Sequence, residues 1–201
     1  TDVVGGSTLE LVRGDSAGTG EILLSGSTLR FVNTEPVVFT NRIVGSGTIE
    51  LAGAPVVFTG REFAALEARP LAKGSVISFP DVAGSDVRYA ALLDGSSLDF
   101  GDAEVVLYDV RGYGTVKGSA VTLAGDIHPG GEGAVGTITF ASAPVIAEGA
   151  KLVSEFDGIS GDRLEIAGGD FSLGDLALDF RMLGNARGMG STTLVSAAAG
   201  A

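Results

Sequence analysis

Hydrophobic and polar residues alternate over short stretches along this chain, and each stretch begins with glycine and then serine or threonine. Successive side chains of a β-strand point to opposite faces, so a period of two predicts a strand that is buried on one face only. The stretches are GSTLEL (6–11), GSTLRF (26–31), GTIEL (47–51), GSVISF (74–79), GSSLDF (95–100), GSAVTL (118–123) and GTITF (136–140).

The spacing of these stretches is regular at the N-terminal end. Leu9, Leu29 and Ile49 lie 20 residues apart, and the pentapeptide PVVFT occurs at 36–40 and again at 55–59. Two short strands and two corners make up about 20 residues, which is one coil of a β-solenoid. We therefore expect an all-β fold, a single solenoid domain over residues 1–201, in which parallel strands of successive coils stack about 4.8 Å apart.

This stacking assigns a direction to each side chain. Leu9, Leu29 and Ile49 are expected to form one inward column, while Arg30 and Glu50 point outward, where Glu50→Ala should be nearly silent. A β-sandwich is the alternative, because its strands also recur at 8 to 12 residues. A sandwich, however, requires no 20-residue interval between similar strands, so the interval favours the solenoid.

One segment interrupts the pattern. Residues 61–72, REFAALEARPLA, carry Phe63 and Leu66 at the i, i+3 spacing of a helix and contain a proline. The segment predicts an irregular or short helical insertion.

The C-terminal half shows a family resemblance. In residues 112–180, a Pro-Gly corner (Ile127 to Gly130) precedes GTITF, followed by the strand Leu152 to Glu155 and then by Asp162 to Gly168. This order resembles the passenger repeats of bacterial autotransporters and of surface proteins with autotransporter-associated β-strand repeats, and GSTTLVSAAAG (190–200) is similar to their closing strand. The resemblance implies a right-handed parallel β-helix on the bacterial cell surface or outside the cell, serving as a non-enzymatic scaffold or adhesin.

Composition narrows the range of partners. The chain has 13 Lys plus Arg against 25 Asp plus Glu, a formal net charge of -12, which disfavours nucleic acid and anionic lipid surfaces. It has no cysteine, so disulfides, thiolate nucleophiles and cysteine-ligated metals are excluded.

Its apolar runs are far shorter than the ~20 residues of a membrane helix, so we expect no membrane span in this segment. The start at Thr1 predicts a processed or excised form.

Paired carboxylates are the candidates for catalysis. A polysaccharide lyase or glycosidase on a β-helix is the alternative function, and it would require two acidic residues on adjacent coils. Asp99 with Asp102, or Asp157 with Asp162, could supply such a pair. Acidic residues at corners are equally typical of an acidic surface, so we predict no catalytic residue and no enzyme activity.

His128 is the only histidine. It precedes a Pro-Gly corner, where a solvated turn residue is the expected role, and one histidine excludes a His-rich metal site. The segment GGEGAV does not match the calcium-binding nonapeptide, and no EF-hand spacing occurs. We therefore predict no metal site and no cofactor.

Two kinds of partner follow from the predicted coils. Arg13-Gly14-Asp15, at the first corner, has the residues of an integrin-binding loop, but three such residues also meet by chance in this composition. The expected contacts are a cell-surface or carbohydrate ligand at the corner loops, and self-association through the strand edges of the end coils, which could build a filament.

Overall fold

The computed structural model describes residues 1–58, 65–70, 76–78, 85–92, 96–102, 104–184 and 191–198, with side chains except for Ser46 and residues 65–92. Within this part of the chain the regular structure is β-strand, apart from one 3₁₀ helix, η1 (Gly14–Ala17). The protein is therefore all-β in the part described.

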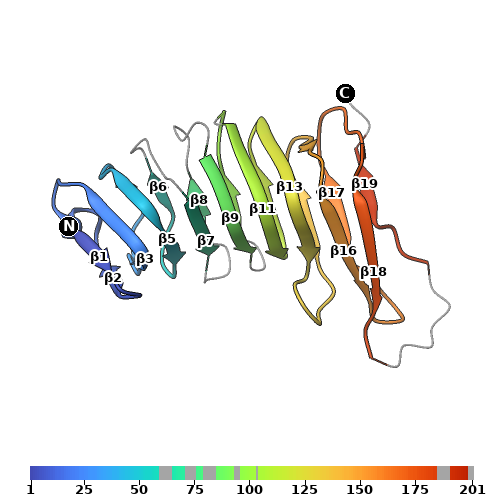
Figure 1. Ribbon diagram of the computed structural model, residues 1–201, viewed down its shortest axis with the longest axis horizontal. Coiled ribbons are helices and arrows are strands. Elements are labelled where there is room, and N and C mark those ends of the chain that lie inside the picture. The colour runs from blue at the N-terminus through green and yellow to red at the C-terminus, as the bar shows by residue number, and fades with distance from the viewer. Residues whose placement is uncertain are drawn as a thin grey trace.

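The strands form two sheets that run along the long axis of the molecule (Figure 1). The larger sheet contains β1 (Asp2–Val4), β2 (Thr8–Leu11), β3 (Ile22–Phe31), β5 (Ile43–Leu51), β7 (Ala65–Pro70), β9 (Ser85–Leu92), β11 (Glu104–Gly112), β13 (Ala120–Pro129), β15 (Val145–Ile146), β16 (Lys151–Phe156) and β18 (Ala177–Met182). The smaller sheet contains β4 (Val37–Phe39), β6 (Val56–Phe58), β8 (Val76–Ser78), β10 (Ser97–Asp99), β12 (Gly114–Lys117), β14 (Thr137–Phe140), β17 (Arg163–Ile166) and β19 (Val195–Ala197).

All ladders between these strands are parallel. From β3 to β14 the chain alternates between the two sheets, so that each strand pairs with the strand two positions away in sequence. Parallel neighbours require a crossover connection. Here a strand of the opposite sheet provides that connection, which is why no helix is required between parallel strands.

The register confirms the predicted column at the N-terminal end. Leu9 pairs with Leu29, and Leu29 pairs with Ile49. The repeated pentapeptide also stacks, since Val37 pairs with Val56 and Phe39 with Phe58. Residues that match in sequence are therefore direct neighbours in space.

The interval between partners is not constant along the chain. It is 20 residues for Leu29 and Ile49, but 16 for Val105 and Val121 and 31 for Leu164 and Val195. The 20-residue repeat holds at the N-terminal end and is wrong as a general value. Corner length can vary because only the strand residues must align.

Residues 65–70 of the expected insertion form strand β7, which pairs with β5 and β9. A helical turn at these residues is therefore a wrong prediction, because pairing on both sides holds the backbone extended. Residues 61–64 and 71–72 lie outside the described part of the chain.

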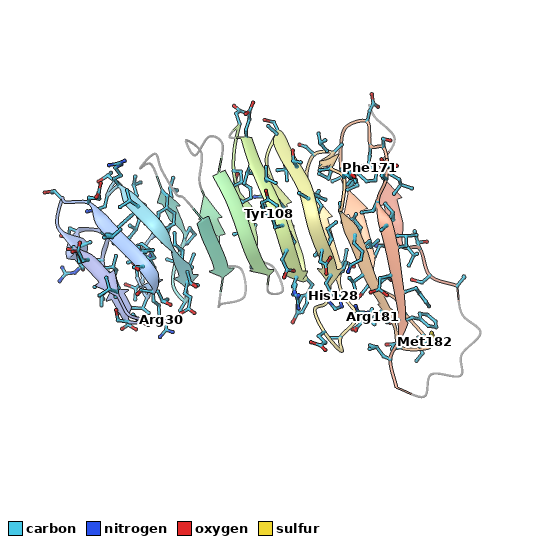
Figure 2. The ribbon with its side chains drawn as sticks, viewed as in Figure 1. Arg30, Tyr108, His128, Phe171, Arg181 and Met182 are labelled. Atoms are coloured by element: carbon cyan, nitrogen blue, oxygen red, sulfur yellow. The ribbon has the colours of Figure 1, made fainter. Side chains whose placement is uncertain are left out.

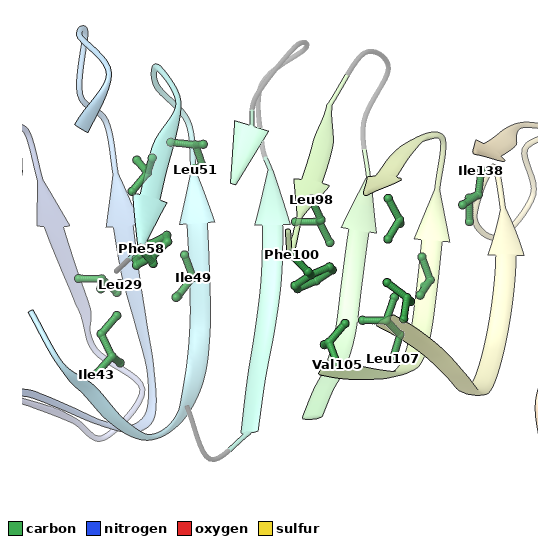
Figure 3. Close-up of a cluster of buried hydrophobic side chains, with 14 of the residues drawn as sticks. Leu29, Ile43, Ile49, Leu51, Phe58, Leu98, Phe100, Val105, Leu107 and Ile138 are labelled. Carbon is green, nitrogen blue, oxygen red and sulfur yellow. The ribbon is translucent and has the colours of Figure 1, made fainter. Parts of the chain in front are cut away.

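The hydrophobic core lies between the two sheets (Figure 3). Leu29 and Ile49 are fully buried, and Phe31 of the larger sheet packs edge to face against Phe39 and Phe58 of the smaller one, with ring centroids 5.0 and 5.3 Å away. Such aromatic contacts add about 0.5–1.5 kcal/mol each beyond area burial. The three phenylalanines therefore join the sheets at this end.

Glu50 requires a correction. Its outward side chain is only 11% exposed, because Arg30 on the neighbouring strand binds it at 2.7 Å. Outward residues on this sheet can thus be covered by their neighbours along the stack, and a change at Glu50 is not expected to be silent.

Candidate functional site

His128 lies near the C-terminal end of β13, at the same edge of the sheet as Arg181 of β18 (Figure 2). Its side chain is 5% exposed, so the expected solvated turn residue is wrong. Strand β13 extends to Pro129 and pairs His128 with Arg111 of β11. The prediction failed because the strand extends beyond the point where the Pro-Gly sequence indicated a corner.

Two carboxylates lie beside this histidine. Glu155 of β16 has its Oε1 atom 3.7 Å from the His128 Nε2 atom, and its side chain is 4% exposed. Asp162, immediately before β17, is fully buried. Nitrogen and oxygen atoms of the three side chains come within 4.8 Å of one another. We call His128, Glu155 and Asp162 the buried triad.

Backbone N–H groups orient both carboxylates. Gly133 donates to Glu155 Oε2 at 2.7 Å, Gly136 donates to Asp162 Oδ1 at 2.8 Å, and the Glu155 amide donates to Asp162 Oδ2 at 2.8 Å. The loop between β13 and β14 therefore folds over the carboxylates from one side. Hydrogen bonds of this kind fix the carboxylate planes and offset part of the cost of burial.

The electrostatics of the buried triad oppose full ionisation. Burial raises the pKa of Asp162 from 3.8 to about 6, with the Glu155 charge adding to the rise, although its two backbone donors act in the opposite direction. Burial also lowers the pKa of His128; the Glu155 charge opposes this, while those of Arg111 and Arg181 support it. The imidazole is thus neutral at pH 7, next to the Asp162 carboxyl group, whose pKa is raised.

Sequence reasoning missed this site because its residues are far apart in the chain. Glu155 and Asp162 both belong to the motifs that carry the family resemblance, and His128 belongs to the corner before them. Those motifs indicate strands and a corner. Only the pairing of β13 with β16 and the backbone bond from Asp162 to Glu155 bring the three side chains together.

The other acidic candidates accept hydrogen bonds at corners, Asp99 and Asp157 from their own turns and Asp102 from a residue 17 positions further along the chain. Asp157 accepts backbone N–H bonds from Ile159 and Ser160 at 2.8 Å each, which lowers its pKa, and it is exposed. Asp99 accepts a bond from the Gly101 amide, and Asp102 accepts one from the Ser119 hydroxyl. These contacts are typical of structural roles at corners.

Glu155 and Asp162 form a close pair of carboxylates, with oxygen atoms within 4.8 Å of one another. Retaining glycosidases use carboxyl groups about 5–5.5 Å apart, so their proximity resembles such a pair. However, both side chains are covered, and a sugar ring could not reach them without displacement of the loop 130–136. A surface groove of about 390 Å³ next to this loop is lined by uncharged residues: Tyr113, Gly114, Thr115, Val135, Gly136, Thr137 and Thr139.

Arg13-Gly14-Asp15 begins at the N-terminal boundary of η1. Arg13 and Asp15 are exposed, while Gly14 lies against Val37, where an added Cβ atom would come within 2.6 Å of a methyl group. The tripeptide is thus accessible but held in a short helix, and whether anything binds it stays a prediction.

The C-terminal end of the larger sheet is apolar. Leu178, Phe180 and Met182 of β18 are aligned with Leu152, Ser154 and Phe156 of β16, yet they are 60%, 51% and 49% exposed. Their counterparts on β16 are buried, and β18 has no strand on its other side among the described residues. We call Leu178, Phe180 and Met182 the end face.

In the part of the chain that the structure describes, we find no helix of the length and apolarity that crossing a membrane requires. Comparisons with protein-family models, with curated proteins and with solved structures find no match to this chain.

Proposed function

We propose that this protein is a non-catalytic structural scaffold: a right-handed parallel β-helix that acts as a stiff spacer on a bacterial cell surface or outside the cell. The observation that carries the proposal is the continuous stacking of parallel strands in both sheets, from β1 to β19. Parallel strands that are paired mainly with their neighbours along one axis are what a solenoid would require, and this supports the proposal. A rod of this kind tolerates variation on its outer surface and can present corner loops for adhesion or carbohydrate binding.

Assignment to an extracellular bacterial protein rests on the resemblance of residues 112–180 to autotransporter passenger repeats. The acidic composition and the absence of cysteine agree with such a role but do not select it. Asp99, Asp102 and Asp157 each accept hydrogen bonds at corners, and Asp162 is buried, which supports a scaffold over the alternative, a polysaccharide lyase or glycosidase.

The end face supports end-to-end association as part of this function. It combines an open strand edge with three exposed apolar side chains that continue the buried column of β16. Open edges of this kind bind further strands. Under this proposal the first strands of a second copy, β1 and β2, cover the end face and extend the stack into a filament.

Sedimentation and small-angle X-ray scattering over a concentration series test both parts. We expect an elongated particle whose mass and maximum dimension increase with concentration. Phe180→Asp should remain monomeric while keeping the elongated shape, because the charge lies on the end face. Ile159→Asp is the matched control, since Ile159 is 89% exposed at a corner, and it should associate as the parent does.

The outcomes separate the two parts of the proposal. A compact globular particle at low concentration would contradict the scaffold. An elongated particle that stays monomeric at every concentration, or equal association of Phe180→Asp and the parent, would contradict only the end-to-end assembly.

A further inference from the structure

The buried triad contains a polar atom that has no partner. His128 Nε2 is buried, and it makes no hydrogen bond in the described structure. Its nearest acidic neighbour, Glu155 Oε1, is 3.7 Å away, which is beyond hydrogen-bond distance. A buried nitrogen without a partner costs about 1–3 kcal/mol, so native structures usually satisfy it with a group that the protein itself does not supply.

One carboxylate oxygen of the buried triad faces the unpartnered His128 Nε2 atom. Glu155 Oε2 accepts the Gly133 amide, whereas Glu155 Oε1, the atom facing His128, has no hydrogen bond among those described. Both Asp162 oxygens accept one backbone N–H each, and a carboxylate oxygen retains a further lone pair after one such bond. The backbone therefore orients the carboxylates and leaves electron pairs free.

The combination of a neutral imidazole with two carboxylates matches the ligands of a divalent transition metal. Zinc is bound by histidine nitrogen and carboxylate oxygen at about 2.0–2.2 Å, whereas calcium and magnesium prefer oxygen alone. Those bond lengths place two ligands of a tetrahedral ion about 3.3 Å apart. The separation of 3.7 Å between Nε2 and Oε1, within a group spanning 4.8 Å, lies within reach of side-chain adjustment.

We propose that His128, Glu155 and Asp162 bind a zinc-like divalent cation, with water as the remaining ligand. The ion would balance the buried carboxylates and give His128 Nε2 a partner. It would also connect β13, β16 and the residue preceding β17, which are successive parts of the stack. The backbone donors Gly133 and Gly136 would then act as outer-shell partners that fix the ligands.

The competing occupant is a proton. A proton on the Asp162 carboxyl group would reduce the buried charge without a metal. The ligand set also includes His128, which such a proton would leave without a partner. A measurement on the imidazole therefore distinguishes the two.

His128 is the only histidine, so its resonances report on this site without a variant. The chelator-treated, ¹⁵N-labelled protein is titrated with Zn²⁺ while the imidazole nitrogens are followed by NMR. We expect the Nε2 resonance to shift at stoichiometric Zn²⁺, and the thermal midpoint to rise with Zn²⁺ and Co²⁺ but not with Ca²⁺ or Mg²⁺. Unchanged imidazole resonances at saturating Zn²⁺ would overturn the metal site and leave the proton as the occupant.

Variants test the ligand assignment. His128→Gln and Glu155→Gln should each weaken Zn²⁺ binding in calorimetry by at least about tenfold, which is the lower end for loss of even an outer-shell partner. Glu148→Gln is the control, because Glu148 is exposed and carries the same charge change, and it should bind as the parent does. Equal Zn²⁺ affinity of His128→Gln and the parent would overturn the proposal. A failure of the metal site leaves the scaffold untouched, because the scaffold is tested by particle shape.

Discussion

The N-terminal stack (residues 1–58) and the C-terminal stack (96–198) are built from the same parallel pairing but are stabilised differently. In the N-terminal stack the partners Leu9, Leu29 and Ile49 recur every 20 residues, and the core is closed by phenylalanine contacts between the sheets. In the C-terminal stack the partners Ile127 and Leu152 are 25 residues apart, and the longer corner supplies backbone donors to buried carboxylates.

The difference shows how the length of a corner affects which polar side chains are covered. A short corner returns the chain to the next strand with little backbone to spare, so outward charged side chains are covered only by their neighbours along the stack, as Glu50 is by Arg30. A longer corner, such as residues 130–136, can fold over the outer face and cover polar groups there. Covering them requires internal hydrogen bonds, because the cost of burying an unpaired charge is high.

The largest expected effect is loss of the fold when a charged side chain replaces an apolar one in the inward column of Leu9, Leu29 and Ile49. Ile49→Asp places a carboxylate at a fully buried position of the hydrophobic core, on a strand between β3 and β7. The loss should exceed about 4 kcal/mol, at the upper end for single substitutions. Circular dichroism and urea denaturation measure it. Val38→Asp is the control, because Val38 is 62% exposed on β4, and a similar loss there would contradict the assigned column.

A smaller effect is expected in the C-terminal stack, where the free energy of unfolding should depend on pH. Because the pKa of Asp162 is raised to about 6 in the folded state, the folded protein binds this proton more tightly than the unfolded chain does. The resulting stability is present below about pH 4 and is lost as the pH rises through 6. A shift of about two pH units corresponds to at most about 3 kcal/mol.

Chelator-treated parent and Asp162→Asn are compared by urea denaturation between pH 4 and pH 7. The advantage of the parent over the variant should decrease as the pH rises, since the variant cannot ionise. His128 contributes with the opposite sign, because its lowered pKa removes stability as the pH falls, but it is present in both proteins. A constant difference across this range would show that Asp162 does not titrate there.

The smallest effect concerns the outer surface of the N-terminal stack. Glu50→Ala removes the nearer of two carboxylates beside Arg30, whose side chain is 38% exposed and keeps Glu10 at 4.0 Å, so the loss should be about 0.5–1 kcal/mol. Added salt should reduce the difference between parent and variant, because the exposed part of the Arg30 side chain leaves the ion pair partly screened. If Glu50→Ala lowered the free energy of unfolding by more than Ile49→Asp does, the proposed ranking, with core residues contributing more than outward residues, would be wrong.

The alternation within the N-terminal repeats was enough to predict their strands and their register. Matching residues such as Phe39 and Phe58 stack because equal intervals place equal side chains in the same environment. Where the interval changes, the pattern still indicates a strand, as in 136–140, but it no longer indicates which residue lies beside it. Segment 61–72 shows the reverse error, since the helical spacing of Phe63 and Leu66 was outweighed at residues 65–70 by pairing with β5 and β9.

By itself the sequence determined that the chain forms β-strands with one apolar face, which residues of the first repeats are neighbours, and which classes of chemistry are excluded by composition. Those properties depend on local alternation and on counts of residue types. Only the tertiary structure decided that His128, Glu155 and Asp162 meet, and that Leu178, Phe180 and Met182 are left uncovered. Both depend on which strands pair and on how each corner folds over them, and neither is encoded in the local pattern of any single strand.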